Sequence, residues 1–438
     1  MKRVTDLLQE LDKLSETVAR TTKRSAPAPR VETPVAESTP VRPIHLGLDY
    51  GTSSSKLILR DRAPDGRERA HIVFSSATRG RARDFRIPSL VCVEGGRLWF
   101  GHEAAARQSL RDVKIYPSIK MRSALPQEFH GLQSALPEGV TADDLATLTV
   151  AYLLQEGHRA AEALARRHRA ELAFSFTLGV PMCELDNSHL RGRFADIARR
   201  AWQIVRGENA PDLRTGVPVL EGWLMVSEAD DAIRRAPAGE ATVRAEAEAA
   251  LLWAYKSEEM EPGVYGTVDV GAGATSASFF HVTPGKSLAF YGASCLAPGA
   301  DAIDAALVGF AGTNDPLAIR AKENAILQRV GEFPAAAIAG QISRTAQRAF
   351  DRAWEKNSNR ASWDNYRLLL TGGGTEIDVV RRKLSLRAGP KLRHAPQVVD
   401  APAPLDLDLD GVSANDLKYL TIAYGLSFPE GSAGVPAG

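Results

Sequence analysis

Residues 47–59 read GLDYGTSSSKLIL, and this stretch decides the fold that we expect. An apolar strand runs into Asp49, a turn of glycine and hydroxyl residues follows, and a second apolar strand begins. Such a turn exposes backbone N–H groups and hydroxyls and forms a concave site for an anion. A carboxylate beside it is placed to hold a cation, although a turn-capping role for Asp49 is the simpler alternative. The stretch predicts a strand–turn–strand unit that binds phosphate together with a metal ion.

The same unit recurs at 264–280, VYGTVDVGAGATSASFF, where Asp269 matches Asp49 and Gly271 matches Gly51. The repeat predicts one supersecondary unit used twice, once in each of two lobes. Two such turns facing each other could hold the phosphates of a nucleotide from both sides. Two carboxylates beside a triphosphate are the oxygen ligands that Mg²⁺ prefers.

A third stretch, LLLTGGGTEIDVVRRKL at 368–384, places Gly372–Gly374 between an apolar strand and a helix. A strand, a glycine turn and a helix in this order commonly bring the backbone close to a nucleotide. A tight strand-to-helix turn is the simpler alternative for this stretch alone. The three stretches in this order are more specific than any one of them.

Their order resembles that in the actin, heat-shock-chaperone and sugar-kinase ATPase superfamily. Within it the chain looks most like the nucleotide-binding domain of the seventy-kilodalton, DnaK-like heat-shock chaperones. Six further stretches carry this resemblance: RIPSLVCVEGGRLWFGHEAAARQ (86–108), VKIYPSIKMRSAL (113–125), TLGVPMCELDNSHLRGRFADIAR (177–199), RAEAEAALLWAY (244–255), APGADAIDAAL (297–307) and IAYGLSF (422–428). The resemblance implies an α/β fold of two actin-like lobes, with duplicated mixed-sheet subdomains around a central nucleotide cleft.

The resemblance also implies that the cleft binds ATP or ADP with Mg²⁺. Catalytic roles fall on Asp49, Lys120, Glu246 and Asp269, and the two aspartates also hold the metal. The implied nucleotide contacts lie in three turns and at the start of one helix: Gly51, Thr52, Ser53, Gly271, Ala272, Gly273, Thr275, Lys322, Gly372, Gly373 and Gly374.

The second turn departs from the family pattern Asp-x-Gly-Gly-Gly-Thr-x-Asp. Its threonine position holds Ala274, its second acidic position holds Ser276 and its middle glycine is Ala272. Thr275 is the candidate to replace the missing hydroxyl, but the lost carboxylate weakens the expected metal and water network. We therefore expect nucleotide binding more firmly than hydrolysis.

Two other positions are less well defined. Glu248 is an alternative to Glu246, because the surrounding stretch is rich in alanine and aligns loosely. The nucleoside-contact pattern at 319–326, IRAKENAI, keeps Lys322 but has isoleucines at its flanking positions.

We expect four segments along the 438 residues. Residues 1–20 form an amphipathic helix with a short heptad seam. This helix docks on a partner, on a second copy or on its own body, and disorder is the remaining alternative. Residues 21–43 are a proline-rich linker, 44–428 are the ATPase domain, and 429–438 are a disordered tail. The resemblance ends near Phe428, so we expect the family's peptide-binding half to be absent.

Strands and helices should be mixed in the ATPase domain. The strands are expected at 44–50, 56–60, 71–75, 88–93, 97–100, 172–180 and 367–371, with a strand–turn–strand at 264–282. The helices are expected at 142–168, 187–206, 245–256, 299–310, 316–331, 335–357 and 414–426, with one more from about Glu376. The alternating LDLDLD at 405–410 suits an exposed edge or loop.

Composition excludes several classes of function. The net charge of +1 gives no reason to expect nucleic-acid or anionic-membrane binding. The three cysteines are far apart, so a disulfide framework or zinc site is not expected, and a reducing cytoplasm fits best. A bacterial cell is part of the leading hypothesis that follows. No apolar run is long enough for a transmembrane helix.

The leading hypothesis is an ATP-dependent conformational switch or weak ATPase that acts on an unidentified protein partner. A pseudo-ATPase adaptor, an actin-like filament protein and, least favoured, a small-molecule kinase are the alternatives.

Overall fold

The computed structural model describes most of the chain between residues 39 and 430. The described ranges are 39–62, 66–75, 84–124, 136, 139–181, 187–235, 241–256, 260–285, 287–296, 298–312, 319, 322–384 and 395–430. Contacts separate Met1–Pro40 from Val41–Gly438, and the following description concerns the second unit. The helix expected over 1–20, the linker as far as residue 38 and the tail from residue 431 lie outside the described residues.

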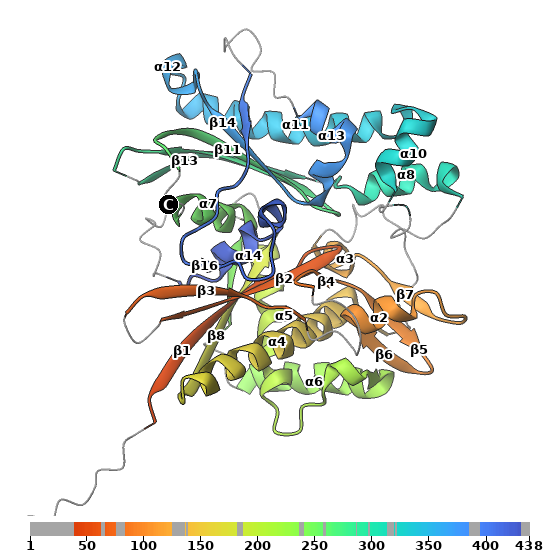
Figure 1. Ribbon diagram of the computed structural model, residues 1–438. Helices are drawn as coiled ribbons and strands as arrows, with labels where there is room; N and C mark the ends of the chain where they lie inside the picture. The colour runs from red at the N-terminus through yellow and green to blue at the C-terminus, as the bar shows by residue number, and fades with distance from the viewer. Residues whose placement is uncertain are drawn as a thin grey trace, which may run out of the picture. The chain divides into compact units, whose positions relative to one another are not determined.

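The first sheet is mixed and contains the strand that ends in Asp49. Its strands follow the order β10–β8–β1–β2–β3–β16, and β4 also pairs with β2 (Figure 1). Their bounds are β1 Val41–Asp49, β2 Ser54–Arg62, β3 Glu68–Ile72, β4 Ile87–Pro88, β8 Glu171–Val180, β10 Ala241–Ala245 and β16 Leu407–Asp408. Strand β1 is antiparallel to β2 across the hairpin and parallel to β8 on its other side.

The second sheet repeats this arrangement around the strand that carries Asp269. Its order is β13–β12–β11–β14–β15. The bounds are β11 Gly263–Val270, β12 Thr275–Val282, β13 Leu288–Leu296, β14 Arg367–Thr371 and β15 Gln397–Val399. Strand β11 is antiparallel to β12 across its hairpin and parallel to β14 on its other side. The sequence repeat therefore corresponds to a repeat of strand connectivity.

Twelve helices are described, together with three short 3₁₀ segments. The helices are α2 Gly101–Arg107, α3 Ile119–Ala124, α4 Ala142–Arg167, α5 Ser188–Arg206, α6 Val219–Arg235, α7 Glu246–Lys256, α8 Asp301–Ala311, α10 Glu323–Val330, α11 Phe333–Lys356, α12 Arg360–Trp363, α13 Asp378–Lys383 and α14 Thr421–Leu426. The 3₁₀ segments are η1 Leu213–Thr215, η2 Gly373–Glu376 and η4 Ala414–Tyr419.

Helices α7 and α14 lie between the two sheets (Figure 1). Adjacent residues of β1 point to opposite faces: the Leu46 side chain packs on α4, whereas Gly47 meets the backbone of α14. Leu251 of α7 belongs to an apolar cluster with residues of the second sheet. Helix α11 covers the other face of that sheet, where a Cβ added at Gly292 would lie 3.1 Å from the backbone nitrogen of Ala353.

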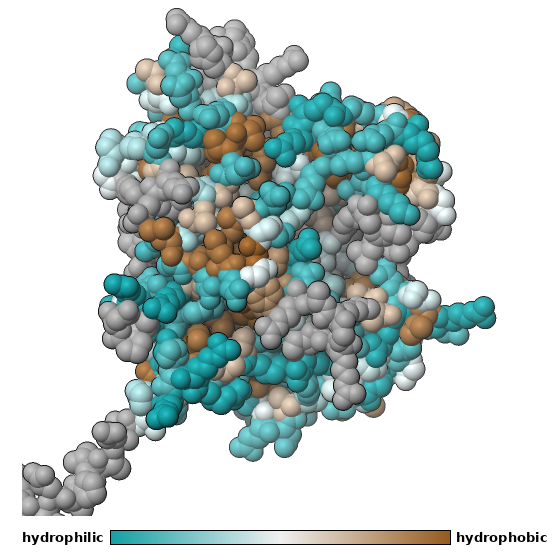
Figure 2. Space-filling model, viewed as in Figure 1, coloured by the Kyte–Doolittle hydropathy of each residue, from teal (hydrophilic) through white to brown (hydrophobic). Residues whose placement is uncertain are grey.

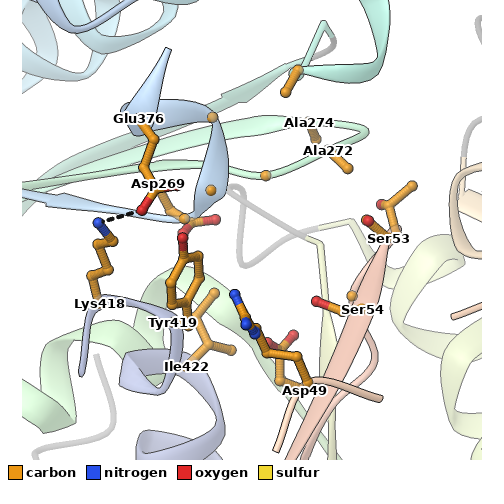
Figure 3. Close-up of a pocket in the computed structure, with 18 of the residues that line it drawn as sticks. Asp49, Ser53, Ser54, Asp269, Ala272, Ala274, Glu376, Lys418, Tyr419 and Ile422 are labelled. Atoms are coloured by element: carbon orange, nitrogen blue, oxygen red, sulfur yellow. Dashed lines mark ion pairs between the residues drawn. The ribbon is translucent and has the colours of Figure 1, made fainter. Parts of the chain in front are cut away.

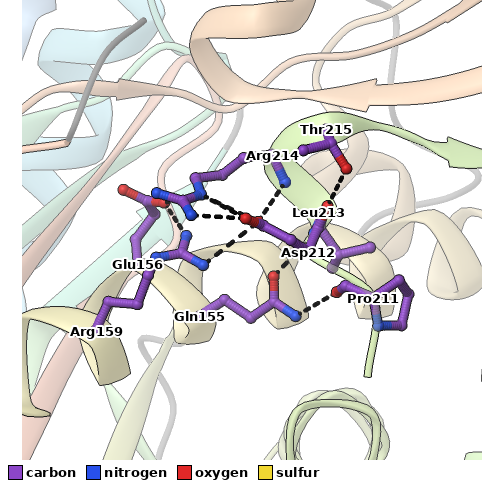
Figure 4. A network of polar contacts seen from close by, with 8 residues as sticks. All are labelled: Gln155, Glu156, Arg159, Pro211, Asp212, Leu213, Arg214 and Thr215. Carbon is purple, nitrogen blue, oxygen red and sulfur yellow. Dashed lines mark hydrogen bonds and ion pairs between the residues drawn. The ribbon is translucent and has the colours of Figure 1, made fainter. Parts of the chain in front are cut away.

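A third, smaller sheet, β7–β5–β6–β9, leads into helix α3. Its strands are β5 Val91–Glu94, β6 Arg97–Phe100, β7 Lys114–Tyr116 and β9 Val217–Pro218. A polar network fastens the segment before β9 to α4 (Figure 4). The Gln155 side chain donates to the carbonyl of Pro211 at 2.8 Å and accepts from the backbone N–H of Leu213 at 3.0 Å. Hydrogen bonds from Arg214 hold the pKa of Asp212 below its usual range, so the network is charged and fixed.

The surface is mainly polar on the face drawn in Figure 2, with apolar side chains in smaller areas between polar ones. None of the helices in the described ranges combines the length and the apolar composition that a bilayer-spanning segment needs.

Most expected elements are confirmed, with bounds that differ by a few residues. The strand expected at 88–93 is divided into β4 and β5. The helix expected at 316–331 is described as α10 from Glu323, and residues 316–318, 320 and 321 lie outside the described ranges. Strand β1 begins at Val41, so 41–43 are strand and the expected linker boundary is wrong there. The segment 245–256 is helical only from Glu246, since β10 precedes it, and 414–426 divides into η4 and α14. The short edge strand β16 lies inside the LDLDLD stretch, as expected.

The contact between α7 and α14 depends on a glycine. A Cβ added at Gly425 would lie 1.8 Å from the carbonyl oxygen of Ala249. We predict that Gly425→Ala lowers the free energy of unfolding by about 1–3 kcal/mol, because the two helices must move apart. Urea denaturation measures this change.

Gly192→Ala is the matched control in helix α5. A Cβ there meets nothing within 4 Å, so alanine should leave stability unchanged or raise it by about 0.5–1 kcal/mol. Equal destabilisation by both substitutions would contradict the packing argument.

Candidate functional site

A cavity of about 640 Å³ lies where β1 and β11 end. Its volume is typical of small-molecule sites, which span about 300–1,000 Å³. The lining residues come from both hairpin turns, from α3, α7 and α10, from the glycine turn after β14, and from the segment that contains Lys418 and Tyr419 (Figure 3).

The first turn is shaped by Gly51 and Lys56. The backbone N–H of Gly51 donates to the carbonyl of Asp49 at 3.1 Å. A Cβ on Gly51 would lie 2.1 Å from the carbonyl oxygen of Ser54, so only glycine fits. The Lys56 ammonium donates to that same carbonyl at 3.0 Å and lies 3.4 Å from Oδ2 of Asp49. A cation therefore stands directly beside the first aspartate.

The second turn is held from behind by the start of helix α8. The backbone N–H groups of Gly299, Ala300 and Asp301 donate to the carbonyls of Gly273, Gly271 and Ala272 at 3.1, 2.9 and 2.7 Å. Within the described part of the chain, the N–H groups of Ala272 and Gly273 have no acceptor. The turn thus presents two unsatisfied donors, which favours binding of an anion.

The two turns approach each other through Gly273. A Cβ added there would lie 2.2 Å from Cγ of Met121 and 2.8 Å from Oγ1 of Thr52. The Ser118 hydroxyl, at the start of α3, donates to the Asp301 carboxylate at 3.0 Å. Helix α3 therefore packs on the second turn through Met121 and is hydrogen-bonded to the first residue of α8, which lies behind that turn.

Three carboxylates and two ammonium groups line the floor of the cavity. Lys120 of α3 forms an ion pair with Glu246, the first residue of α7. Burial alone would lower the pKa of Lys120, but Glu246 and Asp49 outweigh burial and raise it, so the lysine is charged at neutral pH. Burial raises the pKa of Glu246, and the nearby aspartates raise it further.

Asp269 is a second carboxylate in the site whose pKa is raised. Burial raises its pKa, and the Asp49 carboxylate adds to that effect. The Lys56 ammonium opposes the shift, as does a hydrogen bond from the Thr371 hydroxyl to Oδ1 of Asp269 at 3.0 Å. On this floor three carboxylates share two ammonium groups, which favours the arrival of a cation.

The glycine turn after β14 packs against the end of β11. Cβ atoms added at Gly372 and Gly374 would lie 2.5 Å from the carbonyl oxygen and 2.4 Å from Cγ1 of Val270, respectively. Gly372 also has a φ of 78°, which favours glycine. Gly373 lies beside the ring of Tyr419. The cavity wall is therefore formed here by main-chain atoms of glycines, which have no side chains.

The structure brings together most of the residues that the sequence indicates. Those that line the cavity are Asp49, Gly51, Thr52, Ser53, Lys120, Glu246, Asp269, Gly271, Ala272, Lys322, Gly372, Gly373 and Gly374. The alternative Glu248 lies 3.4 Å from Arg244 in an ion pair and is absent from the lining, so Glu246 is the better candidate.

Two residues expected to contact the nucleotide are absent from the lining. Thr275 is fully buried, and its hydroxyl donates to the carbonyl of Pro298 at 3.0 Å, away from the cavity. It is the first residue of β12 and pairs with Val270, so the strand fixes its direction. Gly273 packs between Thr52 and Met121 and is absent from the lining.

Sequence reasoning missed several lining residues, among them Lys56, Arg86, Glu376, Lys418 and Tyr419. Lys56 could have been found, because it is the residue paired with Asp49 across the hairpin. The other four are assembled by tertiary contacts between distant segments.

The donor set fits a magnesium ion only with help from phosphate and water. Asp49 and Asp269 offer carboxylate oxygens, and Thr52 and Ser53 offer hydroxyls. In the described ranges, no group of three or more His, Cys, Asp or Glu side chains could hold a metal. Mg²⁺ commonly takes one or two carboxylates, phosphate oxygens and several waters. These residues fit that arrangement and do not form an all-protein metal site.

Comparison with known proteins yields no assignment: no protein-family model matches the chain, and no curated protein matches it.

The raised pKa of Asp269 makes a prediction about stability. An acid that is harder to ionise in the folded protein destabilises it as pH rises from the unfolded pKa through the raised folded value. In metal-free buffer, Asp269→Asn should therefore raise the melting temperature at neutral pH. The gain should shrink towards about pH 4, where the unfolded aspartate protonates.

Asp61→Asn is the control, and it should change the melting temperature in the opposite direction. Burial opposes the ionisation of Asp61, but hydrogen bonds from His71 and Arg42 outweigh it and lower its pKa. Its stabilisation is present above the unfolded pKa and is lost as pH falls, so the asparagine should lower the melting temperature at neutral pH. Thermal unfolding at several pH values tests both variants, and a lower melting temperature for Asp269→Asn would refute the charge argument.

Proposed function

We propose that this chain is an Hsp70-like ATP-binding protein with a two-lobed, actin-like fold. One observation carries the proposal: two hairpins with matching sequence and connectivity approach each other at one cavity. In each hairpin an aspartate, Asp49 or Asp269, lies at or next to the end of the first strand. The glycine turn after β14 completes the same cavity. The order of the three turns along the chain supports the same assignment.

In this proposal the chain's own groups bind and orient a triphosphate. The free N–H group of Ala272 and the hydroxyls of the first turn receive phosphate oxygens, and Lys56 adds a positive charge. Mg²⁺, held on the side of Asp49 and Asp269, would neutralise charge on the phosphates. Lys120 and Glu246 form a charged pair that can orient a water molecule towards the terminal phosphate.

Nucleotide binding would change how the first and second sheets are held relative to each other. Helix α3, which carries Lys120, packs on the second turn through Met121 and is bound to the start of α8 by the Ser118–Asp301 hydrogen bond. A phosphate bound between the two hairpin turns would contact both of them and could draw them together. Closure around a ligand is a common basis for a conformational switch, and here it would report nucleotide state to a protein partner.

A pseudo-ATPase adaptor is the second candidate, and the second turn favours it. Ala274 lines the cavity without a hydroxyl, and Thr275 faces away from it. Ser276 replaces the second acidic residue of the family pattern. These features weaken the placement of a reacting water more than they weaken phosphate binding.

Binding is tested by calorimetric titration of the full chain with Mg-ATP. Lys56→Gln should weaken binding by about tenfold or more, because it removes a charge-assisted contact from the phosphate site. Lys114→Gln, on the exposed strand residue of β7, is the charge-matched control and should bind normally. A folded wild-type protein that does not bind Mg-ATP would remove the proposed function.

Hydrolysis is tested separately by single-turnover measurement. If the chain is an ATPase, Lys120→Ala should slow turnover by about 100- to 1,000-fold, the usual effect of removing one stabilising group. Its melting temperature must be measured, because the variant leaves Glu246 buried without its partner. ATP binding with no turnover by the wild type would establish the adaptor function instead.

A further inference from the structure

Tyr419 is the only aromatic residue among the described residues that line the cavity. It ends η4, directly before the segment that becomes helix α14. Its ring is partly buried against the apolar cluster that contains Tyr424 and Phe428. One part of the ring is therefore supported by the core, and another faces the cavity.

The ring is held in a fixed orientation. Its hydroxyl donates a hydrogen bond to the carboxylate of Glu376, which also forms an ion pair with Lys418 at 2.7 Å. A Cβ added at Gly373 would lie 3.6 Å from Cε1 of Tyr419, so the glycine turn passes close to the ring edge. A planar surface held in this way loses little conformational entropy when a ligand packs against it.

A second planar group lies next to the ring. The Arg86 guanidinium carbon is 5.6 Å from the centre of the Tyr419 ring, and Arg86 also lines the cavity. Aromatic rings and guanidinium planes are the surfaces on which nucleobases stack.

This surface and the two hairpin turns lie on different sides of the cavity. In Figure 3, Ser53, Ala272 and Ala274 mark the side of the two hairpin turns, and Glu376, Lys418 and Tyr419 lie on the other side. The turns carry the free N–H groups and hydroxyls that suit phosphate, whereas the Tyr419 side carries the aromatic surface. A ligand with phosphates at one end and a flat apolar group at the other fits this division.

We propose that Tyr419, with Arg86 beside it, forms the platform on which the base of the bound nucleotide stacks. This inference rests on the proposed function, since it assigns the base end of the same cavity. Stacking depends on overlap rather than on base-edge hydrogen bonds, so the larger surface of a purine should bind more tightly than that of a pyrimidine.

The test compares two ligands that share the phosphates and differ in the base. Affinities of the full chain for Mg-ATP and for magnesium tripolyphosphate are measured by calorimetry, in the wild type, Tyr419→Ala and Tyr419→Phe. We expect Tyr419→Ala to bind ATP at least about fivefold more weakly, the lower end of the effect of removing a stacking ring. Its affinity for tripolyphosphate should not change.

Tyr419→Phe separates the contribution of ring stacking from that of the tyrosine hydroxyl. It keeps the ring and loses only the hydrogen bond to Glu376, so it should retain most of the affinity for ATP. Retained tripolyphosphate binding shows that Tyr419→Ala is folded, and Lys56→Gln serves as the opposite control, because it should weaken both ligands.

The possible results distinguish a failure of the stacking platform from a failure of the proposed function. Unchanged ATP binding in Tyr419→Ala, equal losses for both ligands, or a wild type that binds ATP no better than tripolyphosphate would overturn the platform. A wild type that binds neither ligand would instead refute the proposed function.

Discussion

The close approach of Gly273 to Thr52 and Met121 is the constraint on which the site depends. No side chain fits at Gly273, because even a Cβ would lie 2.2 Å from Met121. The contact requires the second turn to stay in one conformation, and three N–H groups at the start of α8 hold its carbonyls in place. Two hairpins on different sheets can therefore meet at one cavity.

The second constraint is the pair of helices between the sheets. Gly425 lets α14 contact α7 backbone to backbone, and Gly47 lets α14 contact β1 in the same way. Helix α7 begins with Glu246, so this packing sets where that carboxylate reaches Lys120. The charged pair at the cavity floor is thus positioned by glycines that never touch it.

Local chemistry predicted the central strands and turns well. Apolar strands that end in aspartate and glycine are strong local patterns, and both hairpins formed where the sequence indicated. The start of β1 was missed because Pro43 suggested a linker. Strand β2 pairs with β1 only from Ile44 onwards, whereas β8 pairs from Val41. Pro43 therefore lies where β1 has one free side, and a missing N–H is tolerated there.

The side of the cavity around Tyr419 could not be predicted in this way. Arg86, Glu376 and Tyr419 come from segments far apart in the chain, and none of them has a local pattern that marks it as a binding residue. Thr275 was misjudged for a related reason. A shift by one residue along a strand reverses the side-chain direction, so a threonine next to the expected position points into the core.

The charges of the site connect these observations. Lys56 places an ammonium 3.4 Å from Asp49. This ammonium shifts the side of the first turn towards positive charge. Burial nevertheless leaves Asp269 and Glu246 with raised pKa values. Lys120 pairs with Glu246, so Asp269 is the carboxylate of the floor that most favours a further cation. In the proposed function, phosphate would take the N–H and hydroxyl donors of the turns, and the cation that accompanies it would lie beside Asp269.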